Sequence, residues 1–329
     1  MGEGDERFLT ADDDNFHPSD SEAWFEHETS WFWFFIPERK IGCWIYHFHR
    51  ANIGVEGGGI LLFDEKSPHF TEVPYYRSYW NGQLPTERDM RDYETCSGTR
   101  IKMLEPLTRY KLDYFDRGRL TVDLDWNAIE APWAATPSGE PAKVRHLDQF
   151  GHVTGSIILH GEEMAVDCYA IRDRTWNQLR TEVWKHGGGG GYTCAAADAN
   201  TSFLVLGGKQ IHGGYMTLDG ERHAIVSGTR HLERDDKGYM TSIEMHAVDT
   251  AGREMTAIGE RVSVMSMPIP GVQGICNTSL VRYTINDIPA WGDDQDFWSI
   301  MGWSMFNRGI VGEPVEPKRG GGADRAKNS

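Results

Sequence analysis

A dense group of charged residues follows an alternating apolar run between residues 164 and 180. The segment reads MAVDCYAIRDRTWNQLR, and no loop-like composition separates the apolar run from the charges. Charges at the end of a half-buried strand are costly unless they pair with one another or face a cavity. The group therefore indicates either a structural ion network or the floor of a functional site.

Strand geometry sorts this group into two sets. If the strand continues through residue 176, Asp173 shares one face with Tyr169. Arg172, Arg174 and Trp176 then share the opposite face. A carboxyl group in an aromatic-lined cavity is desolvated, which raises its pKa and suits it to proton donation.

We therefore expect Asp173 to act as the acid or base, with Tyr169 or His152 assisting it. Trp176 would stack on an apolar substrate or stabilise developing positive charge. The alternative is that the Arg-Asp-Arg group is a purely structural ion network that ties two domains together. The sequence leaves both interpretations open.

Other polar and aromatic residues are candidates for the lining of a substrate pocket. With Trp176, we expect this set to comprise Arg172, Arg174, His47, His49 and Tyr215. The two histidines have the spacing that places both rings on one face of a strand, but a metal site needs further ligands. Since no second cluster has convincing spacing, we expect no metal.

Motifs for other chemistry are absent from the sequence. There is no GxSxG nucleophile motif and no strand–GxGxxG–helix unit for a dinucleotide. If the protein is an enzyme, its chemistry is expected to be acid/base catalysis without any cofactor.

Composition narrows the range of partners. A net charge of −16 on 329 residues repels polyphosphate backbones, so we expect no nucleic-acid partner. No apolar run approaches the roughly 20 residues that a bilayer span needs, and the acidic N-terminus does not resemble a secretion signal. Five scattered cysteines fit free thiols in the cytoplasm. The sequence leaves open whether the protein forms a homodimer.

Short β-rich runs separated by Gly, Pro, Asn and Asp dominate the chain and predict an all-β protein. In the run WIYHFHR, for example, Trp44 and Tyr46 point one way and His47 and His49 the other. A proline-rich stretch at 131–142 predicts a boundary between two barrel-like or sandwich halves, at 23–140 and 141–312. Residues 1–22 and 313–329 are expected to be flexible.

The segments HLDQFGHVTG (146–155) and RDRTWNQLR (172–180) resemble the carotenoid-hydratase-like superfamily. The segment at 172–180 is similar to the RDRSWG-type signature of a bacterial branch, with Thr175 and Asn177 in place of its Ser and Gly. Arg180 also lies one residue beyond the position in that pattern. The resemblance covers about residues 25–310 and implies two lipocalin-like β-domains. It also implies addition or removal of water, or polyene cyclisation, without a cofactor.

These observations support one leading hypothesis. The protein is expected to be a cofactor-independent lyase or isomerase acting on an apolar or aromatic small molecule, such as a terpenoid or a lignin-type aromatic. A lipocalin-like protein that binds an apolar ligand without turnover is the alternative. A cyclase that works by folding its substrate is a third possibility.

Overall fold

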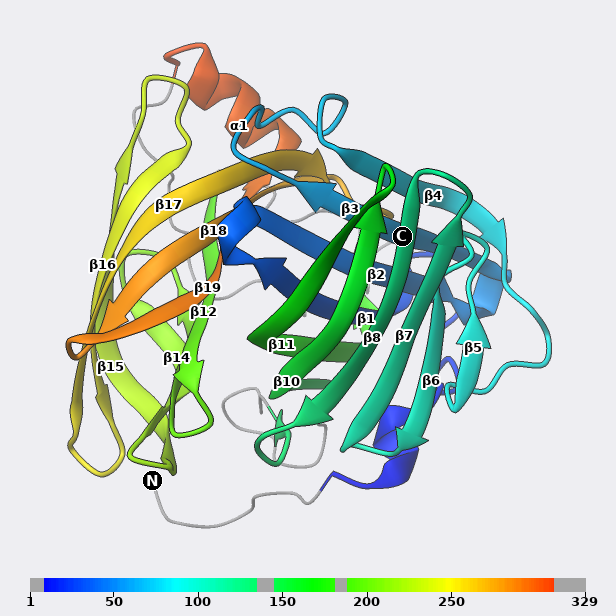
Figure 1. Ribbon diagram of the computed structural model, residues 1–329, viewed down its shortest axis with the longest axis horizontal. Coiled ribbons are helices and arrows are strands. Elements are labelled where there is room, and N and C mark those ends of the chain that lie inside the picture. The colour runs from blue at the N-terminus through cyan, green and yellow to red at the C-terminus, as the bar shows by residue number, and fades with distance from the viewer. Residues whose placement is uncertain (1–8, 135–144, 181–187, 311–329) are drawn as a thin grey trace, which may run out of the picture.

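The computed structural model describes residues 9–134, 145–180 and 188–310, and almost all of the regular structure in these ranges is β-strand. One sheet is open and curled, and the other is a closed barrel. Figure 1 shows the two sheets side by side. The predicted all-β architecture with two lipocalin-like domains is confirmed.

The N-terminal sheet has eleven strands and curls into a half-barrel. Its strands are β1 (Glu26–Ile36), β2 (Ile41–Arg50), β3 (Val55–Phe63), β4 (Tyr75–Gln83), β5 (Asp92–Glu94), β6 (Arg100–Glu105), β7 (Arg109–Asp116), β8 (Leu120–Ala128), β9 (Trp133–Ala134), β10 (His146–Leu159) and β11 (Glu162–Leu179). The order is β4-β3-β2-β1-β11-β10-β8-β7-β6-β5, with β9 paired to β10. The chain therefore returns to the middle of the sheet with β10 and β11.

The C-terminal sheet is an eight-stranded antiparallel barrel in which each strand follows its neighbour along the chain. Its strands are β12 (Gly188–Asp198), β13 (Thr201–Gly207), β14 (Ile211–Leu218), β15 (Glu221–Arg234), β16 (Met240–Asp249), β17 (Glu254–Pro268), β18 (Gly274–Ile285) and β19 (Ile288–Ser299). Helix α1 (Ile300–Asn307) packs next to β18 and β19. In the described part of the chain, no helix has the length and apolarity needed to cross a membrane.

The two sheets divide at a different place from the one we expected. The predicted boundary at residues 140 and 141 would assign β10 and β11 to the second domain. Instead, β11 pairs with β1, and β10 pairs with β8, so both strands complete the N-terminal sheet. The division falls after Leu179 because this hairpin fills the gap between two earlier strands, a long-range pairing that local composition does not encode.

Part of the segment at 1–22, which we expected to be flexible, contacts the N-terminal sheet. A short 3-10 helix, η1 (Ala11–Asp14), packs against the half-barrel, and Asp14 is buried. Residues 1–8 lie outside the described residues, and so does the tail at 313–329.

Strands β1 and β2 are buried along their whole length, unlike β8, which alternates between buried and more exposed positions. One face of β1 and β2 packs into the half-barrel, and the other packs toward the C-terminal barrel. A hydrogen bond of 3.1 Å from Trp44 Nε1 to Thr278 Oγ1 joins the two domains here. The convex face of the sheet thus forms one wall of an interdomain space.

Candidate functional site

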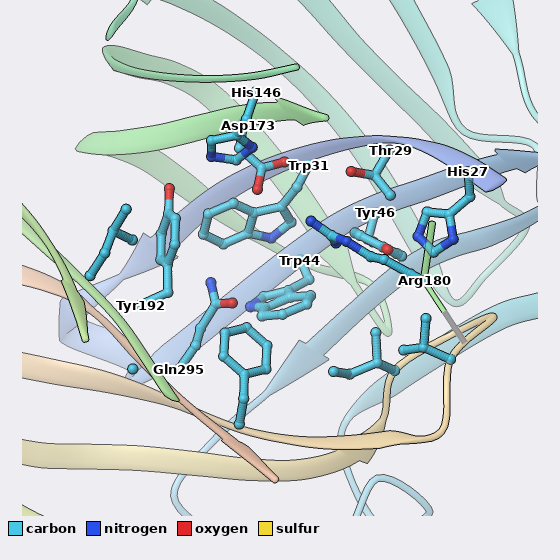
Figure 2. A pocket seen from close by; sticks show the side chains of 15 residues that line it. His27, Thr29, Trp31, Trp44, Tyr46, His146, Asp173, Arg180, Tyr192 and Gln295 are labelled. Carbon is cyan, nitrogen blue, oxygen red and sulfur yellow. The ribbon is translucent and has the colours of Figure 1, made fainter. Parts of the chain in front are cut away.

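A cavity of about 400 Å³ lies between the convex face of the N-terminal sheet and the C-terminal barrel. Most of its lining is aromatic or aliphatic, with a few polar groups (Figure 2). The lining residues are His27, Thr29, Trp31, Trp44, Tyr46, His146, Asp173, Arg180, Gly191, Tyr192, Leu206, Ile269, Val272, Gln295 and Phe297. Its volume falls in the range of about 300–1,000 Å³ that is typical of small-molecule sites.

Asp173 projects into this cavity from the middle of β11, where it pairs with Trp31 of β1 and Asp148 of β10. Its Oδ1 atom is buried and accepts no hydrogen bond from a described residue. Burial raises the pKa of Asp173 to about 6, and the nearby carboxylate of Asp148 adds to this shift. The charges of His146 and of two arginines oppose the shift but do not cancel it. Asp173 is therefore able to exchange a proton near neutral pH.

A chain of hydrogen bonds lies beside Asp173. His146 Nε2 is 3.0 Å from Asp148 Oδ2, and His146 Nδ1 is 2.7 Å from Thr175 Oγ1. The Tyr192 hydroxyl, from the barrel, donates a 2.6 Å hydrogen bond to Asp148 Oδ1. Burial alone would lower the pKa of His146, but the Asp148 carboxylate and its hydrogen bond raise it above the ordinary value. Asp173, which has no hydrogen-bond partner among the described residues, thus lines the cavity next to His146, whose hydrogen-bond partner Asp148 is fully buried behind it.

Aromatic rings from β1 and β2 line one side of the cavity. Trp31 and Trp44 have ring centroids 5.2 Å apart, and Trp44 and Tyr46 have centroids 6.2 Å apart. Tyr192 closes the wall from the barrel side at 5.7 Å from Trp31. Such ring faces bind flat apolar molecules and attract positive charge.

Arg180 reaches the cavity because of an irregularity in β11. Thr29 of β1 pairs with Thr175, but His27 pairs with Gln178, so β11 contains one extra residue in this interval. Asn177 within it adopts a φ of 50°, a left-handed conformation that asparagine tolerates well. Unbroken alternation would place Arg180 on the face of Arg174. The bulge returns it to the face of Asp173.

Three groups at this site have the types and spacing of metal ligands. One ligand atom each from His146, Asp148 and Asp173 lies within 4.8 Å of the others. However, His146 and Asp148 already hydrogen-bond each other, and Asp148 also accepts from Tyr192. Only Asp173 offers a free oxygen, so the arrangement is that of an acid/base group beside a hydrogen-bonded pair.

The sequence profile of the family described as "Domain of unknown function (DUF7064)" matches residues 10–295, which is most of the chain. The chain belongs to the DUF7064 family. No curated protein matches its sequence.

Several solved structures share the fold of this DUF7064 chain. An AttH-like protein from Nitrosomonas europaea aligns with a TM-score of 0.56 at 14% identity, covering 85% of this chain and 93% of its own. The protein CghA aligns at 0.54 and 10% identity, with coverages of 84% and 88%. Kievitone hydratase from Nectria haematococca aligns at 0.53 and 10% identity, with coverages of 91% and 94%. At such low identity these likenesses establish the fold. The RDRSWG-type branch stays a prediction.

Most of the residues that we expected at the site do not line the cavity. Of the nine predicted residues, Asp173 lines it and the other eight do not. Arg172 and Arg174 lie on the concave face of the sheet. Arg172 NH1 is 2.9 Å from Asp14 Oδ1, and Arg174 forms an ion pair with Glu28.

Three other predicted lining residues also lie on the concave side. His47 and His49 are buried there, and His49 Nε2 is 3.8 Å from Glu56 Oε2. Trp176 stacks on His17 with ring centroids 4.4 Å apart. Alternation along β2 and β11 was assigned correctly, but the cavity is on the opposite face of the sheet.

The remaining three lie beyond the ends of the cavity. Tyr169 and His152 stack on each other at 4.8 Å, and His152 Nε2 is 2.6 Å from the exposed Asp167 carboxylate. They share the face of Asp173 but lie further along the strands, where the barrel no longer covers the sheet. Tyr215 is buried between the domains, where it donates a hydrogen bond to Glu130.

Sequence reasoning missed the partners of Asp173, although one signal was available. The two-residue turn at His160 and Gly161 sets the register of the β10–β11 hairpin, and that register places Asp148 opposite Asp173. His146 is two residues away on the same face. No local signal could have identified Tyr192, which comes from the other domain.

Proposed function

We propose that this protein is a cofactor-independent lyase or isomerase of the hydratase type, which acts on an apolar or aromatic small molecule held in the interdomain cavity. The observation that carries this proposal is the carboxyl group of Asp173. Its Oδ1 atom lacks a hydrogen-bond partner among the described residues, burial raises its pKa to about 6, and aromatic rings surround it. A carboxyl group kept in this condition is suited to give and take a proton.

In the hydration direction, the protonated Asp173 gives its proton to one carbon of an isolated double bond. Positive charge then develops on the second carbon, and the faces of Trp31 and Trp44 can stabilise it. Water adds to that carbon and loses a proton to the Asp173 carboxylate, which regenerates the acid. Dehydration is the same sequence in reverse: protonated Asp173 gives its proton to the departing hydroxyl group, and its carboxylate then removes a proton from the neighbouring carbon.

Two further observations support this assignment. Kievitone hydratase, a hydratase by name, has the same fold, although at 10% identity. The crystal structure of CghA has also been solved with Sch210972. Both are consistent with small-molecule chemistry on a two-domain β-scaffold of this kind.

The test is an Asp173→Asn variant, compared with wild type on a panel of terpenoids and lignin-type aromatics by mass spectrometry. Product that differs from substrate by one water identifies the reaction. We expect kcat/KM to fall by about 10²–10⁴-fold in Asp173→Asn, because the proton donor is lost. Asp167→Asn is the matched control, since Asp167 lies on the same face of β11 with its side chain 79% exposed. Full activity in a folded Asp173→Asn variant would remove Asp173 from the mechanism.

The size and apolar lining of the cavity also fit a lipocalin-like carrier. A carrier would show saturable binding without product, and Asp173→Asn would bind as tightly as wild type. A cyclase that acts by shape alone would form product of unchanged mass at a rate insensitive to this substitution. The same panel therefore separates the three functions.

A further inference from the structure

The end of the cavity at His27 is positively charged. Arg180 and His27 lie at this end, while Asp173 and Tyr192 lie on the other side of Trp31 (Figure 2). The Arg180 side chain points inward toward Trp31. No carboxylate in the described ranges forms an ion pair with it.

The ring of His27, at the same end of the cavity, also has no hydrogen-bond partner among the described residues. It is 1% exposed. Burial holds the pKa of His27 well below its usual value, and the charges of Arg180 and Arg50 lower it further. The ring is therefore neutral and keeps one N–H group available to donate a hydrogen bond.

The acidic residue that follows His27 in β1 does not pair with Arg180. Glu28 is on the concave face and pairs with Arg174. Arg50 donates to the carbonyl of Gly271 and forms no ion pair with a described residue. In a protein with a net charge of −16, a cavity end close to two arginines, neither of them paired with a described carboxylate, is a specific arrangement.

We propose that Arg180 and His27 bind a carboxylate group, so that the substrate is a small apolar molecule bearing one carboxylate. This rests on the proposed function for its reacting end, but the binding itself does not require turnover. The guanidinium fork matches a carboxylate in two parallel hydrogen bonds. The apolar body would then lie along Trp31, Trp44 and Tyr46 and present its double bond to Asp173.

Anion binding would also assist the reaction. The positive charge of Arg180 lowers the pKa of Asp173, and a bound carboxylate offsets that charge. Asp173 would then hold its proton more firmly while substrate is present. The anchor thus selects the substrate and keeps the acid protonated.

The experiment compares two probes of the same shape, 2-naphthoate and its neutral amide 2-naphthamide, by calorimetry and by quenching of tryptophan fluorescence. Wild type should bind naphthoate about tenfold or more tightly, as expected for charge-assisted hydrogen bonds. Arg180→Gln should remove this preference by weakening naphthoate alone, and His27→Phe should reduce it. Arg180→Lys, which keeps the charge but loses the fork, should retain part of it. The control Arg282→Gln, at an exposed arginine paired with Glu260, should retain all of it.

Equal affinity of wild type for the two probes would overturn the inference. So would an undiminished preference in both Arg180→Gln and His27→Phe, each shown by circular dichroism to be folded. Failure of the proposed function has a different signature. If Asp173 is not the acid, Asp173→Asn turns over normally, while the preference for naphthoate persists.

Discussion

Three consecutive residues of β11 show how differently the two faces of one sheet use charge. Arg172 and Arg174 point to the concave face, where each has a carboxylate partner in Asp14 or Glu28. Asp173, between them, points to the convex face and has no hydrogen bond or ion pair with a described residue. The same strand therefore carries arginines paired with carboxylates on one side and an unpaired acid on the other.

The pKa directions of Asp14 and Asp173 express the same contrast. Burial alone would raise the pKa of Asp14, but Arg172 and Arg174, with hydrogen bonds from Tyr110 and Leu107, hold it below its ordinary value. Burial raises the pKa of Asp173 to about 6, because the positive charges near it are too weakly coupled to compensate. A buried charge is tolerated where the fold provides charged or hydrogen-bonding partners. An acid that lacks such partners has a raised pKa, which suits it to proton transfer.

The largest expected effect concerns the concave face. Asp14→Ala would leave Arg172 buried without its partner, so the free energy of unfolding should fall by about 3–5 kcal/mol. Urea unfolding followed by circular dichroism measures this change. Asp12→Ala, two residues away and exposed, should change stability by less than about 0.5 kcal/mol. A loss below about 1 kcal/mol for Asp14→Ala would mean that the concave network contributes little to stability.

The second prediction concerns the convex face, where removal of the acid should increase the free energy of unfolding. The unfolded carboxyl group loses its proton near pH 3.8, whereas folded Asp173 retains it to about pH 6. Stability should therefore fall as pH rises through this window and stay level above it. Asp173→Asn should then be more stable than wild type at pH 7 by about 1–3 kcal/mol, with little difference below the unfolded pKa. Equal or lower stability of the variant at pH 7 would contradict a desolvated carboxylate.

The third prediction is the pH dependence of the reaction. Hydration requires protonated Asp173, so its kcat/KM should decline above pH 6, approaching about tenfold per pH unit. Dehydration begins with the same protonated form, so its kcat/KM should decline in parallel with that of hydration. Rates measured between about pH 5 and 8 test both directions. If kcat/KM does not change across that range, protonation of Asp173 does not control the reaction.

Much of the local arrangement was predictable from the order of residues. Alternation correctly separated Asp173 from Arg172 and Arg174, and Trp44 and Tyr46 from the two histidines of β2. Strand alternation depends only on backbone geometry, so it needs no knowledge of distant segments.

The placement of these faces was not predictable in the same way. Neither face of β11 is marked in the sequence as the one that the barrel covers, and we placed Trp176 and the arginines at the wrong side of the sheet. Arg180 changes face through a bulge next to Asn177, and Tyr192 arrives from a separate domain. These features arise from pairing and packing between segments far apart in the chain.

The sequence by itself determined that this is an all-β protein and that a carboxyl group and two arginines occupy opposite faces of one strand. Only the tertiary structure decided which face encloses a cavity and which is filled with ion pairs. The reason is physical: the period of a strand is a local property, whereas solvation of a side chain depends on everything that packs around it.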